Sequence, residues 1–224
     1  MTSSQAVVAP QIALKDPLAF LPHSSVTEHK RRGQVIYHQD QPSTSIHVVI
    51  EGRVKVSRMA NDGRPTVVDI YRTNELFGES ALLGLPQRSE QATALEDTWL
   101  TSWTAAEVEE IVLKRPMLAI ALMQTLVQRT LEYGHRIESL AVDNTSRRLA
   151  RTLIRLSARL GAPEPDGSRR IVGITHELLA QLAGTSREVV THFMIKFRKQ
   201  GYLRYSRQAI ILFPGAFKGT VAID

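Results

Sequence analysis

Residues 175–198 read THELLAQLAGTSREVVTHFMIKFR, and the interpretation of the whole chain starts from this stretch. The pattern is typical of two short helices joined by a tight turn. Ala180 is small where two crossing helices would touch, and Gly184 provides the positive φ that a sharp turn between helices needs. The stretch therefore predicts a helix-turn-helix.

The second of these helices is expected to begin with a capping box. Thr185 is followed three positions later by Glu188, whose carboxylate can reach back to the amide of the capping residue. Ser186, Arg187 and Glu188 would then lie at the exposed N-terminal end, where a recognition helix contacts base edges. The apolar inner face of this helix is expected to be formed by Val190, Phe193 and Phe197.

A small wing is predicted after the second helix. Residues 201–205 and 209–212 read as two short strands around the turn at residues 206–208. An ordinary helical hairpin with a solvated charged face is the alternative. The wing favours a winged helix-turn-helix instead.

The charge of the chain is concentrated in its C-terminal part. Residues 144–224 hold 14 Lys and Arg against 5 Asp and Glu, a net of +9, whereas residues 1–143 have a net of −3. A basic C-terminal module fits the phosphate backbone of double-stranded DNA. No isolated basic amphipathic segment and no long apolar run indicates a membrane partner, and nothing at the N-terminus is typical of a signal peptide. A cytoplasmic location is therefore expected.

The N-terminal half is predicted to be rich in short strands. Its clearest β-type runs are residues 35–37, 46–50, 54–56, 67–71 and 99–103. Asn61-Asp62-Gly63, between two of these runs, is a strong hairpin signal because both turn residues must accept a positive φ. Short strands at regular intervals predict a small antiparallel barrel or roll.

A long helix is expected to connect the two halves. Residues 105–113 read as a short helix that ends before Pro116, and residues 117–142 contain no internal proline. Apolar and small residues along the long helix alternate spacings of four and three, which is typical of a coiled-coil seam. The seam is Ala119, Met123, Leu126, Thr130, Tyr133, Ile137 and Leu140. It favours a parallel homodimer, with packing on its own domain as the alternative.

The expected fold class is α+β. We expect an N-terminal arm (1–22), a jelly-roll-like β roll (23–115), a dimerisation helix (116–143) and a winged helix-turn-helix DNA-binding domain (144–224). Another helix is expected at residues 147–160, after a break and new cap at residues 143–145.

A local motif adds a family resemblance. Residues 76–83 read LFGESALL and residues 86–89 read PQRS, which is similar to the phosphate-binding cassette of the cyclic-AMP receptor protein/fumarate-nitrate regulators (CRP/FNR) of bacteria. The order of β roll, long helix and winged helix-turn-helix resembles the same family from about Phe20 to Leu212. The resemblance implies that the β roll is of the cyclic-nucleotide-binding type and is an effector domain. In members that bind cyclic nucleotides, the residues matching Gly78, Glu79, Arg88 and Ser89 hold the ligand. Glycine lets the backbone approach, the carboxylate accepts from a ribose hydroxyl, and Arg and Ser donate to the phosphate.

The chain departs from the cassette at two places. Glu90 follows the Arg-Ser pair and is expected to lie beside Arg88 and neutralise it, so that with Glu79 the local formal charge would be −1. Tyr133-Gly134 replaces the Thr-Ser pair that reaches the adenine in cyclic-AMP responders, and Tyr133 could stack on a base. Cyclic AMP or another cyclic nucleotide, another small anion or cyclic dinucleotide, and no ligand at all remain the alternatives.

Two other cofactors belong to branches of the same family. An iron–sulfur cluster held by cysteines is excluded because the chain has no cysteine. No metal site is expected, and the candidate haem ligands His38, His47 and His135 read better as ordinary surface or hydrogen-bonded residues.

The resemblance also implies the DNA contacts. Arg187 can donate to guanine O6 and N7, and Glu188 can accept from cytosine N4, so a half-site resembling TGTGA is expected. His192 stands where the family has a third reader, an arginine, so readout there should weaken or change. Phosphate contacts are expected from Thr175, His176, Ser186 and Thr191.

The expected function is a homodimeric transcription regulator on a near-palindromic site, with RNA polymerase as a partner. Two alternatives remain: a constitutive regulator without ligand, and a nucleotide-binding regulatory subunit without a DNA role. An enzyme is not expected, because the sequence shows no nucleophile–base arrangement, metal-ligand spacing or P-loop.

Overall fold

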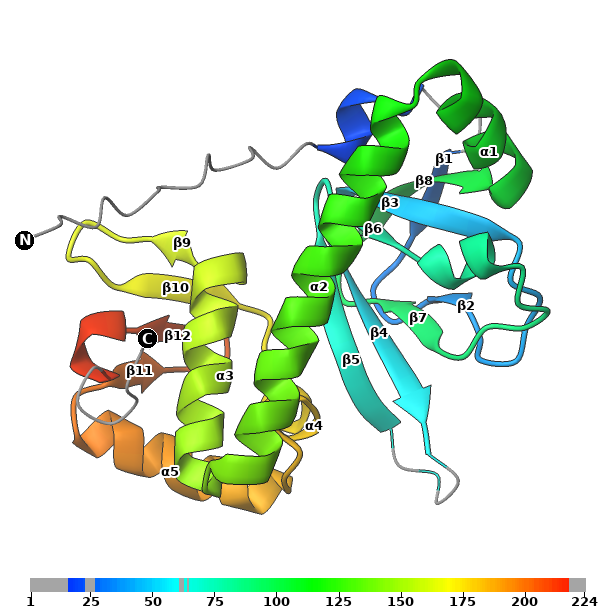
Figure 1. Ribbon diagram of the computed structural model, residues 1–224. Helices are drawn as coiled ribbons and strands as arrows, with labels where there is room; N and C mark the ends of the chain where they lie inside the picture. Colours follow the sequence, from blue (N-terminus) through cyan, green and yellow to red (C-terminus); the bar gives the residue numbers. More distant parts are fainter. Residues whose placement is uncertain (1–15, 23–26, 61–62, 64, 218–224) are drawn as a thin grey trace, which may run out of the picture.

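The computed structural model describes residues 16–22, 27–60, 63 and 65–217. Figure 1 shows an N-terminal β domain and a C-terminal module of helices and strands on either side of the long helix α2 (Met117–Val142). This α+β arrangement confirms the predicted fold class. Residues 1–15 of the predicted N-terminal arm lie outside the described residues, and residues 16–22 contain the short 3-10 helix η1 (Pro17–Ala19).

The β roll consists of two antiparallel four-stranded sheets. One has the strand order β1-β8-β3-β6 and the other the order β2-β7-β4-β5. The strands are β1 (Thr27–Lys30), β2 (Val35–Tyr37), β3 (Ser45–Glu51), β4 (Arg53–Met59), β5 (Pro65–Arg72), β6 (Leu76–Phe77), β7 (Gln91–Ala94) and β8 (Thr98–Thr104). Alternate residues such as Ile46 and Val48 on β3 are buried, as expected for strands with one face on the core.

The predicted hairpin is present between β4 and β5, which pair in register from Arg53 opposite Arg72 to Met59 opposite Pro65. Gly63 has a φ of 78°, which suits glycine in a tight turn. Asn61 and Asp62, the other residues of the predicted turn, lie outside the described residues.

Helix α1 (Ala105–Lys114) and α2 follow the β roll, as predicted. Thr104 and Glu107 form a reciprocal capping box at the start of α1. The first part of α2 packs against the β roll through Leu118 and Leu122, which are buried with Ile46, Val48 and Trp103. Asn144 then caps α3 (Thr145–Leu160) by accepting from the backbone N–H of Arg147, so α3 begins two residues earlier than the sequence indicated.

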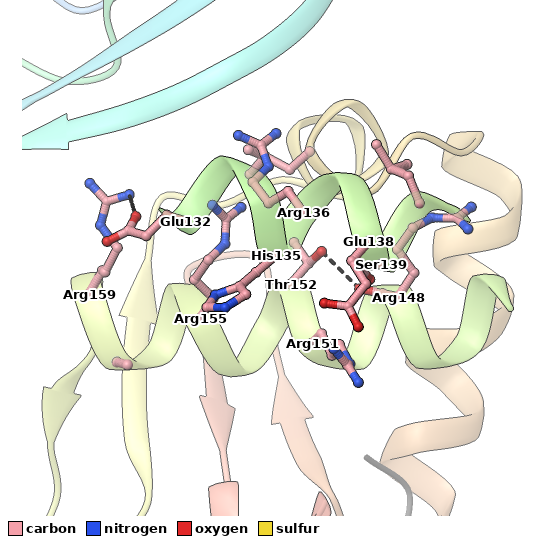
Figure 2. Close-up of a pocket in the computed structure, with 13 residues that line it drawn as sticks. Glu132, His135, Arg136, Glu138, Ser139, Arg148, Arg151, Thr152, Arg155 and Arg159 are labelled. Atoms are coloured by element: carbon pink, nitrogen blue, oxygen red, sulfur yellow. Dashed lines mark hydrogen bonds and ion pairs between the residues drawn. The ribbon is translucent and has the colours of Figure 1, made fainter. Parts of the chain in front are cut away.

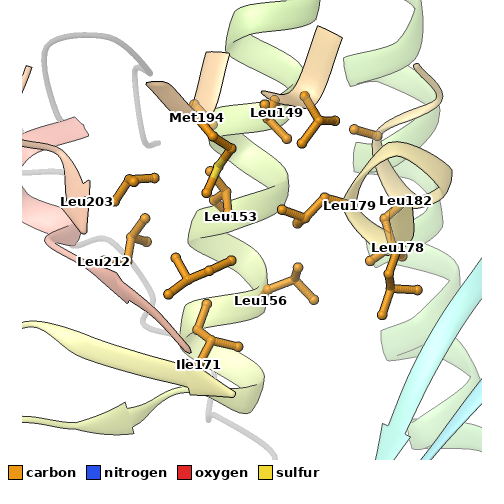
Figure 3. Close-up of a cluster of buried hydrophobic side chains, with 14 of the residues drawn as sticks. Leu149, Leu153, Leu156, Ile171, Leu178, Leu179, Leu182, Met194, Leu203 and Leu212 are labelled. Carbon is orange, nitrogen blue, oxygen red and sulfur yellow. The ribbon is translucent and has the colours of Figure 1, made fainter. Parts of the chain in front are cut away.

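The C-terminal module packs three helices on a small sheet. Helices α3, α4 (His176–Ala183) and α5 (Arg187–Lys199) cover a four-stranded sheet of order β11-β12-β10-β9. The strands are β9 (Ala162–Pro163), β10 (Arg169–Val172), β11 (Leu203–Tyr205) and β12 (Ala209–Leu212), and a 3-10 helix η3 spans Pro214–Phe217. Figure 3 shows the core where leucines of α3 meet those of α4 and the sheet.

The wing prediction is confirmed, because β11 and β12 pair antiparallel. The inner face of α5 was predicted less well. Val190 and Phe197 are buried, but Met194 takes the central position and Phe193 is only half-buried. Positions 190, 193 and 197 and positions 190, 194 and 197 fit the 3.6-residue period equally well, so the period alone could not decide between Phe193 and Met194.

The two modules contact each other directly. Val67 and Ile70 of β5 belong to the same buried cluster as the C-terminal core, and α4 packs against β5. Arg159 of α3 donates to both carboxylate oxygens of Asp69, at 2.8 and 2.9 Å. The position of α4, and with it the helix-turn-helix, is therefore tied to the β roll in this arrangement.

Candidate functional site

The turn between α4 and α5 is fixed from several sides. Gly184 adopts φ 60° and ψ 51°, and a Cβ at this position would lie 3.2 Å from Leu140. The Nε of Arg148 donates to the carbonyl of Ala183 at 2.6 Å. Thr175 caps α4, because the N–H of Leu178 donates to its hydroxyl at 3.1 Å. The helix-turn-helix is thus held by the helix that precedes it.

The start of α5 differs from the prediction. Ser186, and not Thr185, is the N-cap, and its hydroxyl accepts from the N–H of Val189 at 3.4 Å. The predicted capping box between Thr185 and Glu188 is therefore wrong. The helix begins one residue later, at Arg187, and Ser186 has the extended backbone (φ −91°, ψ 158°) of a cap.

Arg187 and Glu188 both lie exposed in the first turn of α5. Hydrogen bonds from the amide of Glu188 itself and from the Ser186 side chain lower the pKa of the Glu188 carboxyl. The group is therefore an ionised acceptor near neutral pH, beside a fixed guanidinium donor. This pairing of an acceptor and a donor at a helix N-terminus suits base edges in the major groove.

Two of the expected phosphate contacts bind each other. The Nδ1 of His176 and the Oγ1 of Thr191 are 2.9 Å apart, and the Thr191 hydroxyl donates to the carbonyl of Arg187 at 2.9 Å. Burial and the charge of Arg187 lower the pKa of His176, which keeps the ring neutral at pH 7. Both side chains therefore link α4 to α5, whereas His192 is exposed.

The cassette of the β roll is built around a buried arginine. Arg88 is 2% exposed, its guanidinium donates to the carbonyl of Gly78 at 2.7 Å and to that of Ser45, and it lies 4.2 Å above the ring of Tyr37. Gly78 has a φ of 76°, and a Cβ there would lie 3.0 Å from Arg88. Glycine at this position is thus required both by the backbone and by the close arginine.

Some polar atoms of this cassette are unpaired. The Nε of Arg88 and the hydroxyl of Tyr37 are buried and have no hydrogen-bond partner among the described residues. Buried donors of this kind are usually satisfied, so a ligand oxyanion is a fitting partner. His47 stacks on Tyr37 and Phe77, and burial with the nearby charge of Arg88 lowers its pKa to about 4.

Glu90 does not pair with Arg88 as expected. Its carboxylate accepts from Ser89 at 2.5 Å and lies 4.0 Å from Arg58. Residues 88–90 precede β7 and do not form a strand, so the rule that places alternate residues on one face does not apply. Arg58 also donates to the hydroxyl of Ser89 at 3.1 Å.

A second arginine missed from the sequence lies on α2. Arg129 forms an ion pair with Glu79 at 3.1 Å and lies 4.8 Å above the ring of Tyr71. With Arg58, Arg88 and Arg129 against Glu79 and Glu90, the local formal charge is +1 and not −1. Arg129 stands four positions before the predicted ligand residue Tyr133, so both lie on the same face of α2. This spacing is the signal in the sequence that could have revealed Arg129.

Tyr133 lies between α2 and the β roll. It hydrogen-bonds Tyr71, and burial together with the charge of Asp69 raises its pKa. The structure therefore brings Tyr133 next to the Glu79–Arg129 pair, while Arg88 belongs to the neighbouring group around Tyr37. Over the described ranges, no group of three or more His, Cys, Asp or Glu side chains is placed to hold a metal ion. Within those same ranges, no helix is long and apolar enough to cross a membrane.

Comparisons with known proteins agree with both candidate sites. Residues 27–115 match the cyclic nucleotide-binding domain, and residues 147–216 match the Crp-like helix-turn-helix domain. The chain is 26% identical over 181 residues to the CRP-like cAMP-activated global transcriptional regulator of Mycobacterium tuberculosis, with 81% of each protein covered. It is 29% identical over 189 residues to the global nitrogen regulator of Synechococcus elongatus, covering 83% of this chain and 85% of that protein.

A solved structure supports the same fold. FixK2 from Bradyrhizobium japonicum superposes with a TM-score of 0.77 at 19% identity, over 89% of this chain and 98% of that one. The domain order, the two domain matches and these relatives agree with the cassette and the winged helix-turn-helix described above. The chain belongs to the CRP/FNR family of DNA-binding transcription regulators.

Proposed function

We propose that the protein is a homodimer that reads a near-palindromic DNA site and is controlled by a small anionic effector in the β roll. The observation that carries the DNA role is the paired exposure of Arg187 and Glu188 in the first turn of α5. The net charge of +9 on residues 144–224 supports a DNA-backbone partner for the same module.

In this proposal Arg187 and Glu188 read bases, with His192 as a weaker third reader. Thr175 and Ser186 lie at the N-termini of α4 and α5, where backbone N–H groups favour phosphates. His176 and Thr191 position these two helices: the Thr191 hydroxyl donates to the Arg187 carbonyl and the neutral His176 ring donates to Thr191, so in this arrangement neither side chain has a further donor for a phosphate.

The exposed apolar residues of α2 support the homodimer. Met123, Val127, Leu131 and Ile137 are 57, 60, 59 and 68% exposed. Together with Ile120, Leu126 and Leu140 they form a stripe along the helix, which a second copy would cover in a coiled-coil seam. The predicted seam is retained in part: Tyr133 faces the β roll instead, and Leu131 joins the stripe.

The proposed effector site consists of Gly78, Glu79, Arg88 and Ser89, with Arg58, Arg129 and Tyr133 added. The local charge of +1 and the unpaired Nε of Arg88 favour a phosphodiester such as that of a cyclic nucleotide. Cyclic AMP is the first candidate, because the mycobacterial relative is named as activated by it.

The coupling we propose runs through α2. Glu79 is paired with Arg129 and Tyr71 with Tyr133, so a ligand that takes over Glu79 releases one contact that holds α2 on the β roll. The ligand must bind one arrangement of α2 and the C-terminal module more tightly than the other, because only differential binding shifts a population.

Four further assignments belong to the same proposal. We propose the domain boundaries 23–115, 116–143 and 144–224 for effector domain, dimerisation helix and DNA-binding domain. RNA polymerase is the expected protein partner, the cytoplasm is the expected location, and the chain is not expected to be an enzyme. A constitutive regulator without an effector is the second candidate, favoured by the internal bonds that already hold Arg88.

Calorimetry of the full chain with cyclic AMP, cyclic GMP and cyclic di-GMP tests the effector. We expect the wild type to bind cyclic AMP with measurable heat. The affinity for cyclic AMP should fall at least about tenfold in Arg58→Gln and in Ser89→Ala. Both residues are at the surface of the cassette, so these variants are expected to keep the fold. The absence of heat with all three compounds would favour the constitutive regulator.

A further inference from the structure

A cavity of about 490 Å³ lies between the second half of α2 and α3 (Figure 2). It shares no lining residue with the cassette or with the readers on α5. Five arginines and two glutamates line it, a formal excess of three positive charges. The charged lining residues are Glu132, Arg136, Glu138, Arg148, Arg151, Arg155 and Arg159.

The arginines of α3 form a row directed at α2. Arg148, Arg151, Arg155 and Arg159 are spaced by three, four and four residues, which places them on one face of the helix. The opposite face carries the leucines that Figure 3 shows in the C-terminal core. The row is therefore turned toward the cavity, as Figure 2 shows.

Four of the five arginines in the cavity already donate to backbone carbonyls or to carboxylates. Arg148 donates to the carbonyls of Ala183 and Asp143, at 2.6 and 3.1 Å. Arg151 forms an ion pair with the buried carboxylate of Asp143 at 3.2 Å. Arg159 is paired with Asp69, Glu75 and Glu132, at 2.8, 3.0 and 3.8 Å.

Arg155 makes no hydrogen bond or ion pair within the part of the chain that the structure describes. Arg136, like Arg148, donates only to backbone carbonyls, in its case those of Val67 and Val68. Burial and the charge of Arg136 lower the pKa of Arg155 to about 10, and the carboxylates of Asp69 and Glu132 offset only part of this effect. Two partly buried like charges thus lie close together, an arrangement that costs free energy unless an anion joins them.

We propose that this cavity binds a small molecule with two or more adjacent anionic phosphates, which Arg136 and Arg155 hold. Guanidinium groups bind phosphate oxygens through paired N–H donors, and two of them match at least two negative charges. The volume lies within the range of small-molecule sites, and Leu140 and Leu182 provide an apolar wall for the rest of the ligand.

The position of the cavity gives the ligand a regulatory role. Arg136 lies on α2 and Arg155 on α3, so a phosphate chain between them would fix the angle between these two helices. Arg148 of α3 holds the carbonyl of Ala183 in the turn of the helix-turn-helix. The ligand would thereby change the orientation of α5, independently of the effector site in the β roll.

Calorimetry of the full chain with inorganic triphosphate, and with orthophosphate for comparison, tests the site. We expect triphosphate to bind at one molecule per chain, and Arg155→Gln and Arg136→Gln each to lower its affinity at least about tenfold. Arg32→Gln is the matched control, because Arg32 is exposed in a turn of the β roll outside the cavity. Arg187→Gln should also keep the affinity, which excludes binding on the DNA-reading face. Thermal unfolding checks that every variant is folded.

Four results would overturn the proposal. The first is equal triphosphate affinity in the wild type, Arg136→Gln and Arg155→Gln, and the second is a loss in Arg187→Gln as large as in Arg155→Gln. The third is that, without triphosphate, DNA binding by Arg155→Gln depends less on salt than DNA binding by the wild type, which would show that Arg155 contacts a DNA phosphate. The fourth is dissociation of the dimer by Arg155→Gln, which would assign it to a carboxylate of the second copy. Binding of cyclic AMP by Arg155→Gln is measured as well. It is expected to equal that of the wild type, so the test of this cavity stays separate from the test of the cassette.

Discussion

Arg187 is the residue on which the proposed DNA contact depends most. It is exposed at the first position of α5, immediately after the cap Ser186, while Thr191 and His176 hold the helix behind it. The sequence alone placed it at a helix N-terminus. It could not show that Ser186 and not Thr185 is the cap, because both residues are good caps and only the local backbone distinguishes them.

Substitution of Arg187 by alanine should reduce DNA affinity and specificity together. We expect a cost of about 1–3 kcal/mol on the preferred site and relaxed preference at one base pair, because a bidentate base contact is lost. Anisotropy titrations on a panel of single-base variants measure both effects. The control is Arg170→Ala: Arg170 lies on β10, outside α5, and is paired with Glu164. If Arg187→Ala bound every member of the panel with the same affinity as the wild type, α5 would not be the helix that contacts the bases.

His47 gives a prediction of pH dependence. Its pKa is lowered to about 4 in the folded protein, against about 6.5 in the unfolded chain. Between these values the unfolded chain binds more protons, so the free energy of unfolding rises with pH across this window and falls as the protein is acidified. The contribution should be about 1–3 kcal/mol, fully present above pH 6.5 and lost toward pH 4.

Chemical denaturation at a series of pH values measures this contribution. In His47→Gln the slope of the unfolding free energy between pH 4 and 6.5 should be smaller than in the wild type by that amount. Identical slopes in the two proteins would show that the ring is not buried in neutral form beside Arg88.

Helices and strands were predictable where a local pattern decides them. The long α2 lacks proline, and each correctly predicted strand contains a run of β-branched or aromatic residues. Strand β9 (Ala162–Pro163) has no such pattern and pairs only with β10, and β10 has just two β-branched residues, Ile171 and Val172, after two arginines and pairs with β9 and β12. The seam of α2 was predicted from its spacing, yet which side Tyr133 faces depends on the β roll.

A charged residue in the stripe of α2 should break the dimer. Ile137 is 68% exposed in the single chain, so Ile137→Glu should keep the fold while it places a carboxylate in the seam. We expect the dimer dissociation constant to rise at least about tenfold in sedimentation experiments, with a parallel loss of DNA affinity. Leu113→Glu on α1 is the matched control, because Leu113 is 81% exposed outside the stripe.

The dimer interface would lie elsewhere if Ile137→Glu sedimented like the wild type, or if Leu113→Glu dissociated equally. A wild-type chain that is monomeric at the concentrations used for DNA binding would contradict the seam altogether.

At the scale of the molecule, the sequence revealed the division into an N-terminal β domain and a basic C-terminal module, but not the contacts that join them. The charge difference between residues 1–143 and 144–224 was visible at once. The bond between Arg159 and Asp69 joins positions 90 residues apart, and Arg53 reaches the carbonyl of Val172 across 119 residues. No local pattern marks such pairs, since they exist only once both modules have folded.

These contacts have a functional consequence. They hold α4 against β5, and the partners of Arg129 and Arg159 lie on the β roll. A ligand bound at the cassette or in the cavity between α2 and α3 can therefore change the position of α5, because the ion pairs of Arg129 and Arg159 connect α2 and α3 to the β roll.

Selection of binding sites from random double-stranded DNA by the purified full chain tests the central claim most directly. A homodimer with two-fold symmetry should enrich two inverted half-sites whose centres are about 10–10.5 base pairs, or a multiple of this, apart. Each half-site should contain a G·C pair whose enrichment disappears in Arg187→Ala. Enrichment of a single unrepeated half-site, or of no sequence at all, would contradict a dimeric, sequence-reading regulator.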